Sequence, residues 1–379
     1  DIRPLTLIAG VNGMGKSSII QSLLLLRQSY ELESLQKRDK KVRLRSDYVN
    51  LESMADLCYS WAKERTVGIT LVDDVAQKYN WSINSTNADE DSPECTYEGS
   101  GMDGLSLFGD NFVFLSAERI GPREVYARSS VSMNQTKFGV HGEMTPSYLY
   151  KALITNEDIA IKDMCKVEGQ LQLIENLNAW MTVIMGIGMK VFPQEVDSKQ
   201  VKVQYGYSNS IERYSALQVG FGFSYSIPVI SALLCADRGD LLIFENPEAH
   251  LHPQAQVNIG VMIAKAVSCG VQVILETHSD HIMNGIRLAR KRGLLSKEQV
   301  IMFFVQREMQ DGMNVTFTEK IEINDNGKFI SYSPKFGYIG HLSQSINTDL
   351  TFTKTNFIQQ LKNKNIIDNY YWYINYNKD

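Results

Sequence analysis

The fold is decided by the stretch Gly10-Val11-Asn12-Gly13-Met14-Gly15-Lys16-Ser17. A short apolar run at residues 5–9 precedes it, and apolar residues recur at helical spacing between Ile19 and Leu26 after it. Glycines, a lysine and a serine at these spacings, between a strand and a helix, form the pattern of a phosphate-binding loop. Glycines let the backbone wrap closely around a phosphate, and the helix N-terminus adds positive potential. The stretch therefore predicts a nucleotide site.

Two side chains of this loop have expected roles of their own. Lys16 is expected to reach the β- and γ-phosphates of ATP, and the Ser17 hydroxyl is expected to ligate Mg²⁺. The residues that we expect to contact the nucleotide are Asn12, Gly13, Met14, Gly15, Lys16, Ser17 and Ser18. The alternative is a glycine-rich helix start that binds no ligand.

A second motif ends an apolar strand at residues 241–244 with the run Glu245-Asn246-Pro247-Glu248. The carboxyl ends of parallel strands face the ligand crevice of α/β sheets, so these acids are expected beside Mg²⁺ and the attacking water. Glu245 is the expected metal ligand, and Glu245 and Glu248 are the expected catalytic carboxylates. The alternative is that the acids only cap the next helix.

A third motif, Glu276-Thr277-His278-Ser279, ends an apolar strand expected at residues 271–275. A histidine at this position can donate a hydrogen bond to a γ-phosphate oxygen or hold the attacking water. We therefore expect His278 to be catalytic. The alternative is a histidine with a purely structural role.

The chain is organised around alternating strands and helices. From residue 215 to 305 this alternation predicts a parallel sheet with helices on both faces. The expected segments are 1–83, the first part of the ATPase lobe with the phosphate loop; 84–111, a surface loop; 112–214, a helical or regulatory insertion with connecting strands; 215–310, the second part of the ATPase lobe; and 311–379, a C-terminal hairpin and tail.

The insertion and the tail carry more specific expectations. Residues 145–189 are expected to be helical, with an edge hairpin from Asn314 and a helical tail around residues 357–361. The expected core positions of the insertion are Tyr148, Leu149, Leu153, Leu171, Ile174, Leu177 and Trp180.

Composition narrows the classes of protein. The chain has 379 residues, of which 44% are hydrophobic and 21% charged, and these values exclude collagen-like, wholly disordered and purely coiled-coil proteins. The charge is −5, from 38 Lys and Arg against 43 Asp and Glu, which argues against nucleic-acid binding by bulk charge alone. A local basic patch stays open, because residues 37–45 and 287–292 are each rich in Lys and Arg.

The sequence gives no expectation of a membrane segment. Its longest strongly apolar run, residues 227–236, is half of the roughly 20 residues that a membrane helix requires, and no charged and then apolar leader opens the chain. We expect a soluble, cytoplasmic protein. The chain opens at Asp1 directly before a strand, so residues before it are expected to be missing.

Taken together, the motifs resemble those of the ABC-type ATPases of the overcoming-lysogenization-defect group and their relatives in bacterial phage-defence systems. More distantly, they resemble SMC and RecF-like repair ATPases. The similarity spans most of residues 3–305. The matching pieces are Arg3-Pro4-Leu5-Thr6, Gly15-Lys16-Ser17-Ser18, Glu245 to Pro253, and Thr277-His278-Ser279-Asp280-His281. A further run, Leu115 to Arg123, is similar to a defence-associated branch.

The resemblance implies a P-loop NTPase with an ABC-like head, a parallel sheet core and a helical insertion. It also implies an ATPase that works as a homodimer or higher oligomer, with each ATP held between one subunit's phosphate loop and the partner's signature segment. The candidate signature is the run from Gln218 to Ser224, in which Gly220, Gly222 and Ser224 would contact the nucleotide. The family's Ser-Gly-Gly string is absent, so a plain glycine-rich bend is the alternative.

A second departure concerns hydrolysis. The family's strand-end pair is Asp then Glu, whereas the matching residues here are Glu245 and Asn246. An amide cannot act as a base, so Glu248 is the expected substitute, with hydrolysis that is slow or depends on a partner. His250 and His252 are expected either to contact the neighbouring subunit or to form a polar helix start.

A cluster of charged residues follows the strand expected at 112–115. Glu118, Arg119 and Arg123 are expected to lie at the nucleotide or at the lobe boundary. Structural ion pairing is the alternative.

Two main functions stay open from the sequence. The first is an ATP-dependent switch in phage defence that controls a separate nuclease or toxin, because the roughly seventy residues after the last ATPase strand are too few for a nuclease domain. The second is a DNA-repair or DNA-clamping ATPase that uses the basic runs. A third is a nucleotide-locked scaffold that does not hydrolyse ATP, because of Asn246.

Overall fold

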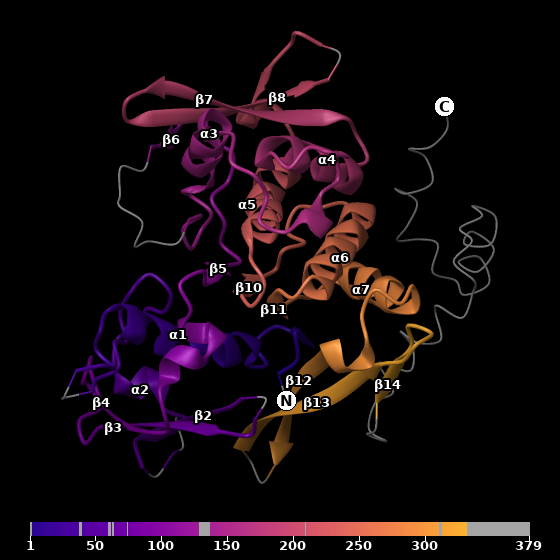
Figure 1. Ribbon diagram of the computed structural model, residues 1–379. Helices are drawn as coiled ribbons and strands as arrows, with labels where there is room; N and C mark the ends of the chain where they lie inside the picture. The colour runs from indigo at the N-terminus through magenta and orange to yellow at the C-terminus, as the bar shows by residue number, and fades with distance from the viewer. Residues whose placement is uncertain are drawn as a thin grey trace. The chain divides into compact units, whose positions relative to one another are not determined.

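A seven-stranded sheet forms the centre of the protein (Figure 1). The computed structural model describes residues 2–37, 40–59, 62, 64–73, 75–128, 137–208, 210–310 and 313–331. The strands lie in the order β14 (Phe329–Ser331), β13 (Met313–Ile323), β12 (Val300–Gln310), β1 (Leu5–Gly10), β11 (Gln272–Glu276), β10 (Leu241–Glu245) and β5 (Val113–Leu115). The five from β12 to β5 run parallel, and β13 and β14 are antiparallel.

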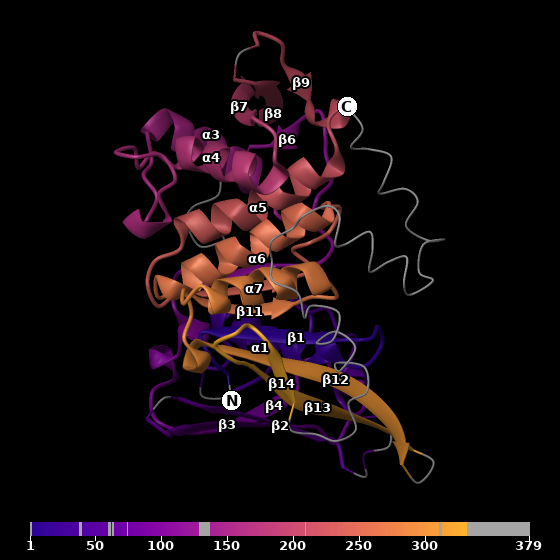
Figure 2. The same ribbon diagram turned by 90° about the vertical axis from the view of Figure 1, so that its right-hand side faces the viewer.

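Helices cover both faces of this sheet, as the alternation predicts. Helix α1 (Lys16–Glu31) lies on one face, and α6 (Pro253–Ser268) and α7 (Asp280–Lys291) lie on the other (Figure 2). Strand side chains alternate between the faces. Ile8, Ile243 and Ile274 pack with Ile20 and Leu24 of α1 in one buried cluster. The residues next to them in each strand point to the other face, where α6 and α7 lie. The fold is therefore α/β with a parallel core.

A small antiparallel sheet packs against the α1 side of the core. It consists of β2 (Thr66–Val72), β3 (Lys78–Asn84) and β4 (Glu94–Glu98). Residues 84–111 were expected to be a surface loop, and the structure differs because β4 lies within them. The strand has only five residues between polar turns, too short for a clear alternation signal, yet it buries Cys95 against β3.

The short elements beside this sheet complete its buried side. Helix α2 (Met54–Leu57) and the 3₁₀ turns η1 (Met102–Gly104) and η2 (Ser106–Phe108) contribute Met54, Met102, Leu107 and Phe108 to the core cluster.

The insertion contains the predicted helices and also a hairpin that was not predicted. Its helices are α3 (Thr145–Thr155), η3 (Lys162–Met164) and α4 (Leu173–Met185), and its strands are β6 (Tyr126–Ala127), β7 (Met189–Asp197), β8 (Gln200–Tyr207) and β9 (Tyr214–Ser215). Leu149, Ile174, Leu177 and Trp180 are buried as expected. The expectation for Leu153 is wrong, because it lies on the outer face of α3 and is 42% exposed.

The chain returns to the core through η4 (Ala216–Gln218) and α5 (Phe221–Cys235), and η5 (Lys297–Gln299) precedes β12. The expected edge hairpin corresponds to β13 and β14. The helical tail expected around residues 357–361 lies outside the described residues. No helix in the described part of the chain is long and apolar enough to cross a membrane.

Candidate functional site

The phosphate loop lies where the sequence places it, between β1 and α1. Its glycines adopt backbone conformations that other residues rarely adopt, with φ of 75° at Gly13 and 98° at Gly15. A Cβ on Gly10 would overlap the carbonyl oxygen of Val305 on the neighbouring strand. By contrast, a Cβ on Gly13 would meet no atom within 4 Å. Gly10 is therefore required by the packing of the sheet, and Gly13 lines open space.

Lys16 begins α1 and folds back over the loop. Lys16 is 4% exposed, and its Nζ donates a hydrogen bond of 2.9 Å to the carbonyl oxygen of Val11. Burial lowers the pKa of Lys16, and the nearby carboxylate of Glu276 opposes that shift. The ammonium group thus sits inside the loop, where phosphate oxygens would be stronger partners than one carbonyl.

Glu276 is a candidate site residue that the sequence analysis missed. It ends β11, in register with Ile8 of β1 and Glu245 of β10, so it lies between the phosphate loop and the acidic motif. Ser17 Oγ donates a hydrogen bond of 3.2 Å to its Oε1. The residue is only 5% exposed. The signal available in the sequence was an acid at the end of an apolar strand, the same signal as at Glu245.

The carboxyl group of Glu276 lies in an environment that disfavours its charge. Burial and then the neighbouring Glu245 raise its pKa, while Lys16 and Ser17 oppose the shift. Its Oε2 is buried and has no hydrogen-bond partner among the described residues. A buried carboxylate oxygen with no partner costs free energy that a cation would recover.

Glu245 lies beside Glu276 at the end of β10. Its Oε2 accepts a hydrogen bond of 3.1 Å from the backbone N–H of Ala117, which follows β5. Burial raises the pKa of Glu245, and the Ala117 hydrogen bond and Arg119 oppose the shift. The two expected metal-binding residues, Ser17 and Glu245, are therefore brought to one sheet edge with Glu276 between them.

Glu248 and His278, both expected to be catalytic, meet at the same edge. Glu248 Oε1 accepts hydrogen bonds from Thr277 Oγ1, at 2.7 Å, and from the backbone N–H of His278, at 2.9 Å. Its Oε2 is buried and has no partner among the residues the structure describes. Glu248 does not cap the next helix, because His252 is the N-cap of α6 and accepts from Gln254 N.

The surroundings of His278 favour the neutral form of its imidazole. Burial and the positive charge of Lys16 lower its pKa, and Glu248 and a hydrogen bond with the backbone of Gly10 oppose that shift. A neutral ring beside the phosphate loop can donate one hydrogen bond and accept another. That is the chemistry expected for a γ-phosphate contact.

The turn after β10 explains the unusual Asn246. Its φ is 43°, in the left-handed region that asparagine tolerates better than glutamate does. Its N–H donates to the carbonyl of Glu276 at 2.9 Å, and its buried Oδ1 has no partner within the described ranges. The turn therefore favours an asparagine and directs Glu248 toward β11.

The candidate signature segment is only partly accessible. Gly220 is exposed, with φ of −60° at the N-cap of α5. A Cβ on Gly222 would lie 2.7 Å from the carbonyl oxygen of His250, so this glycine is needed for close packing of α5 on the loop after β10. The glycine-rich bend, kept as the alternative, accounts for Gly222.

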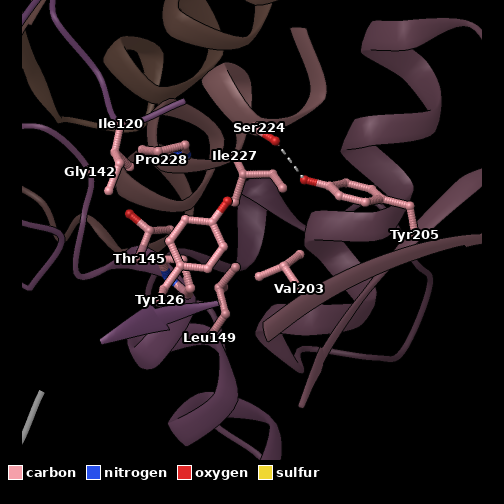
Figure 3. Close-up of a pocket in the computed structure, with 11 residues that line it drawn as sticks. Ile120, Tyr126, Gly142, Thr145, Leu149, Val203, Tyr205, Ser224, Ile227 and Pro228 are labelled. Carbon is pink, nitrogen blue, oxygen red and sulfur yellow. Dashed lines mark hydrogen bonds between the residues drawn. The ribbon is translucent and has the colours of Figure 1, made fainter. Parts of the chain in front are cut away.

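Ser224 faces the interior of the insertion. It is 8% exposed, and its Oγ lies 3.3 Å from the hydroxyl of Tyr205 (Figure 3). Both hydroxyls line a cavity of about 20 Å³, together with Tyr126 and with Thr145, whose Oγ1 is buried without a partner in the described structure. The Ser224 hydroxyl therefore faces this cavity, whereas the sequence analysis expected it to contact a nucleotide.

The expected basic cluster on α7 does not form a single surface patch. Arg287 and Arg290 are each 7% exposed. Arg287 donates to the carbonyl of Gly327, and Arg290 donates to the carbonyl of Leu295 and pairs with Asp325. These two arginines tie α7 to the turn before β14.

The residues present fit a nucleotide with its cation. The loop offers open space at Gly13 and a buried ammonium at Lys16. The strand ends offer oxygens of Glu276, Glu248 and Asn246 that have no partner among the described residues. Phosphate oxygens are suitable partners for the ammonium group, and Mg²⁺ is a suitable partner for the carboxylate and amide oxygens. Together with the parallel sheet, this loop defines the fold of the chain as that of a P-loop NTPase with a helical insertion.

Comparison with known proteins adds a family match. Residues 178–284 match a family model described as "AAA domain, putative AbiEii toxin, Type IV TA system". That segment includes Glu245, Glu248 and His278 but not the phosphate loop. No curated protein matches the chain.

Several solved structures are similar over 83% of this chain and 89% of their own. An SMC head bound to the C-winged helix domain of ScpA has a TM-score of 0.45 at 14% identity. The SMC head domain from Thermotoga maritima has a TM-score of 0.36 at 11% identity. An SMC head domain with an extended coiled coil, derived from Pyrococcus furiosus and bound to the C-terminal domain of ScpA, has a TM-score of 0.40 at 14% identity.

Proposed function

We propose that the protein binds Mg²⁺·ATP at the end of the parallel sheet and hydrolyses it. The observation that carries this proposal is the convergence of Lys16, Ser17, Glu276 and Glu248 from three separate segments of the chain. In this arrangement Lys16 exchanges the Val11 carbonyl for the phosphates. Mg²⁺, held through Ser17 and Glu245 with Glu276 beside them, would neutralise charge on the phosphates.

In this proposal Glu248 is the base. A water oxygen attacks the γ-phosphorus, the bond from that phosphorus to the β–γ bridging oxygen breaks, and ADP and phosphate leave. The proton of the water goes to Glu248, whose free Oε2 is available, while Thr277 and His278 hold its Oε1. Because Asn246 stands where the family has its glutamate and Glu248 acts from two residues further along the chain, we expect slow turnover.

Calorimetric titration and phosphate release test this proposal directly. The wild-type protein is expected to bind ATP with Mg²⁺ and to release phosphate, and Glu248→Gln is expected to bind ATP but to release phosphate at least about tenfold more slowly. Absence of ATP binding to the wild-type protein would refute the nucleotide site. Equal turnover in Glu248→Gln would refute Glu248 as the base.

We further propose that ATP closes a homodimer and that this state controls a separate nuclease or toxin in anti-phage defence, in the cytoplasm. Two observations support it: the resemblance of the motifs, and the description of the matching family as a putative toxin of a toxin–antitoxin system. Light scattering of Glu248→Gln with and without ATP tests the dimer. Purification with the products of neighbouring genes tests the effector, and a protein that stays monomeric and alone would contradict both parts.

Direct DNA binding is the second candidate. It is favoured by the exposed side chains of Arg43 and Arg45 near the small sheet, whereas Arg287 and Arg290 are buried and do not contribute. Binding to duplex DNA that weakens steeply with salt would support this function. A nucleotide-locked scaffold remains the third candidate, and measurable turnover by the wild-type protein would exclude it.

A further inference from the structure

Arg119 is a buried cation next to the acidic motif. It follows β5 and is only 2% exposed. Its Nη1 donates to the carbonyls of Ser116, at 3.0 Å, and Glu245, at 2.8 Å, and its Nη2 donates to the carbonyl of Asn246, at 2.6 Å. The rigid planar fork of a guanidinium suits several acceptors at once. One side chain therefore holds the end of β5 to the turn after β10.

This position is costly for a charge. Burial lowers the pKa of Arg119 to about 10, and Glu248 is the first of the neighbours that oppose the shift, so the group stays protonated at neutral pH. Its Nε is buried without a partner among the described residues. Replacing a buried ionic group by apolar residues is often neutral or stabilising, so the arginine is not explained by stability alone.

The carbonyls that Arg119 holds belong to the turn that directs Glu248. Asn246 has φ of 43°, and its N–H donates to the carbonyl of Glu276 at 2.9 Å. Arg119 on the carbonyl side and Glu276 on the amide side thus hold the peptide groups on either side of Asn246. The direction in which the chain continues to Glu248 depends on both contacts.

Arg119 also contacts the start of α5. Its guanidinium carbon lies 5.7 Å from the ring centroid of Tyr225. The ring of His250, in the loop after β10, lies 4.4 Å from that of Tyr225 and 5.6 Å from that of Phe221. A continuous set of contacts therefore runs from the acidic turn through Arg119 to the first turns of α5, which include residues 221–224 of the candidate signature.

We infer that Arg119 is a positioning residue that sets the geometry of the turn carrying Glu248 and links that turn to the start of α5. This inference rests on the proposed hydrolysis for its catalytic consequence but not for its structural one. The Arg119 side chain does not touch the nucleotide in this account. Its loss should change turnover through Glu248 and leave the phosphate loop intact.

Hydrogen exchange of the full chain without nucleotide tests the structural part. The reporting amides are those of Asn246, Ala249 and Leu251, which donate within the turn or to Glu276. In Arg119→Ala they are expected to exchange at least about tenfold faster, while amides of β1 and α1 change by less than about twofold. Unchanged protection of the turn in Arg119→Ala would overturn the inference, whether or not the protein hydrolyses ATP.

Kinetics test the catalytic part with a matched control. Arg119→Ala is expected to lower kcat at least about tenfold, with ATP affinity within about threefold of wild type. Arg128 is the control, because it also lies over a tyrosine ring but pairs with Glu195 in the insertion. Arg128→Ala is expected to keep wild-type kcat. An equal loss of ATP affinity and kcat in Arg119→Ala would contradict a positioning role.

Arg119→Lys covers the case in which the alanine variant does not fold. It keeps the charge but offers a single nitrogen, which cannot bond three carbonyls in a fork. We expect faster exchange in the turn and a lower kcat here as well. Full protection and full turnover in Arg119→Lys would show that charge suffices and would overturn the inference. Failure of wild-type hydrolysis alone would refute the proposed function and leave the exchange result to decide this one.

Discussion

The phosphate loop and the start of α5 are both glycine-rich helix starts, and both were expected to contact the nucleotide. In the loop, Gly13 and Gly15 adopt positive φ, and a Cβ on Gly13 would meet nothing within 4 Å. At α5, Gly222 is packed against the carbonyl of His250, and Ser224 is buried beside Tyr205. Glycines at a helix start can therefore serve two different purposes, room for a ligand or close backbone packing. Only the surrounding atoms distinguish the two.

The largest effect is expected at Lys16. Lys16→Ala should weaken ATP binding about 10- to 100-fold, because a charge-assisted contact with the phosphates is lost from a buried site. Calorimetric titration with Mg²⁺·ATP measures the change. Lys297→Ala, at an exposed side chain that pairs with Glu298, is the control and should bind normally. Normal ATP binding by Lys16→Ala would contradict the role of the phosphate loop in binding the nucleotide.

The next effect concerns Glu276, which lies beside the loop and has no counterpart at α5. Glu276→Gln should reduce, by about tenfold, the factor by which Mg²⁺ strengthens ATP binding. It should also raise the Tm of the nucleotide-free protein by about 2 °C, because it removes a buried charge next to Glu245. Titration with and without Mg²⁺ and thermal unfolding measure the two changes. Glu124→Gln, at an exposed side chain, should change neither quantity.

The difference in Tm between the wild-type protein and Glu276→Gln is expected to depend on pH. The folded protein raises the pKa of Glu276 above the ordinary value of 4.5, so its charged form is less favourable in the native state than in the unfolded state. As pH falls through the raised pKa, the wild-type carboxylate becomes neutral, and the difference in Tm from Glu276→Gln should disappear. A difference that grows at low pH would contradict this electrostatic account.

Glycine substitutions separate the two causes directly. Gly13→Ala should weaken ATP binding and cost about 1 kcal/mol of stability through its positive φ. Gly222→Ala should cost about 1–3 kcal/mol through contact with His250 and leave the intrinsic ATP affinity of the folded monomer unchanged. Denaturant unfolding and titration measure both quantities. Gly188→Ala, where a Cβ meets nothing within 4 Å, is the stability control. Loss of ATP-dependent dimerisation in a folded Gly222→Ala protein would restore the signature interpretation.

The smallest effect is expected at Ser224. Ser224→Ala should change ATP turnover by less than about twofold, because the hydroxyl faces the cavity and not the nucleotide. Phosphate release measures it. A tenfold loss of turnover would place Ser224 in the active site of a closed dimer. The start of α5 would then contact the nucleotide, as the phosphate loop is proposed to do.

The loop that carries His250 and His252 illustrates a prediction left between two alternatives. His252 caps α6, which supports the polar helix start. His250 has φ of 62° and packs on Tyr225, so it connects α5 to the acidic turn within one chain. A histidine near the surface has no local pattern that separates these roles, because the partner ring is 25 residues away in sequence.

The sequence by itself determined the phosphate loop, the acidic strand end and the alternating core. Each of these depends on residues that are neighbours along the chain, where glycine conformation, apolar periodicity and helix starts act locally. Only the tertiary structure decided that Glu276 lies between Ser17 and Glu245, that Arg119 holds the turn before Glu248, and that Ser224 is buried. Those contacts depend on the register and packing of segments distant in sequence, which no local pattern encodes.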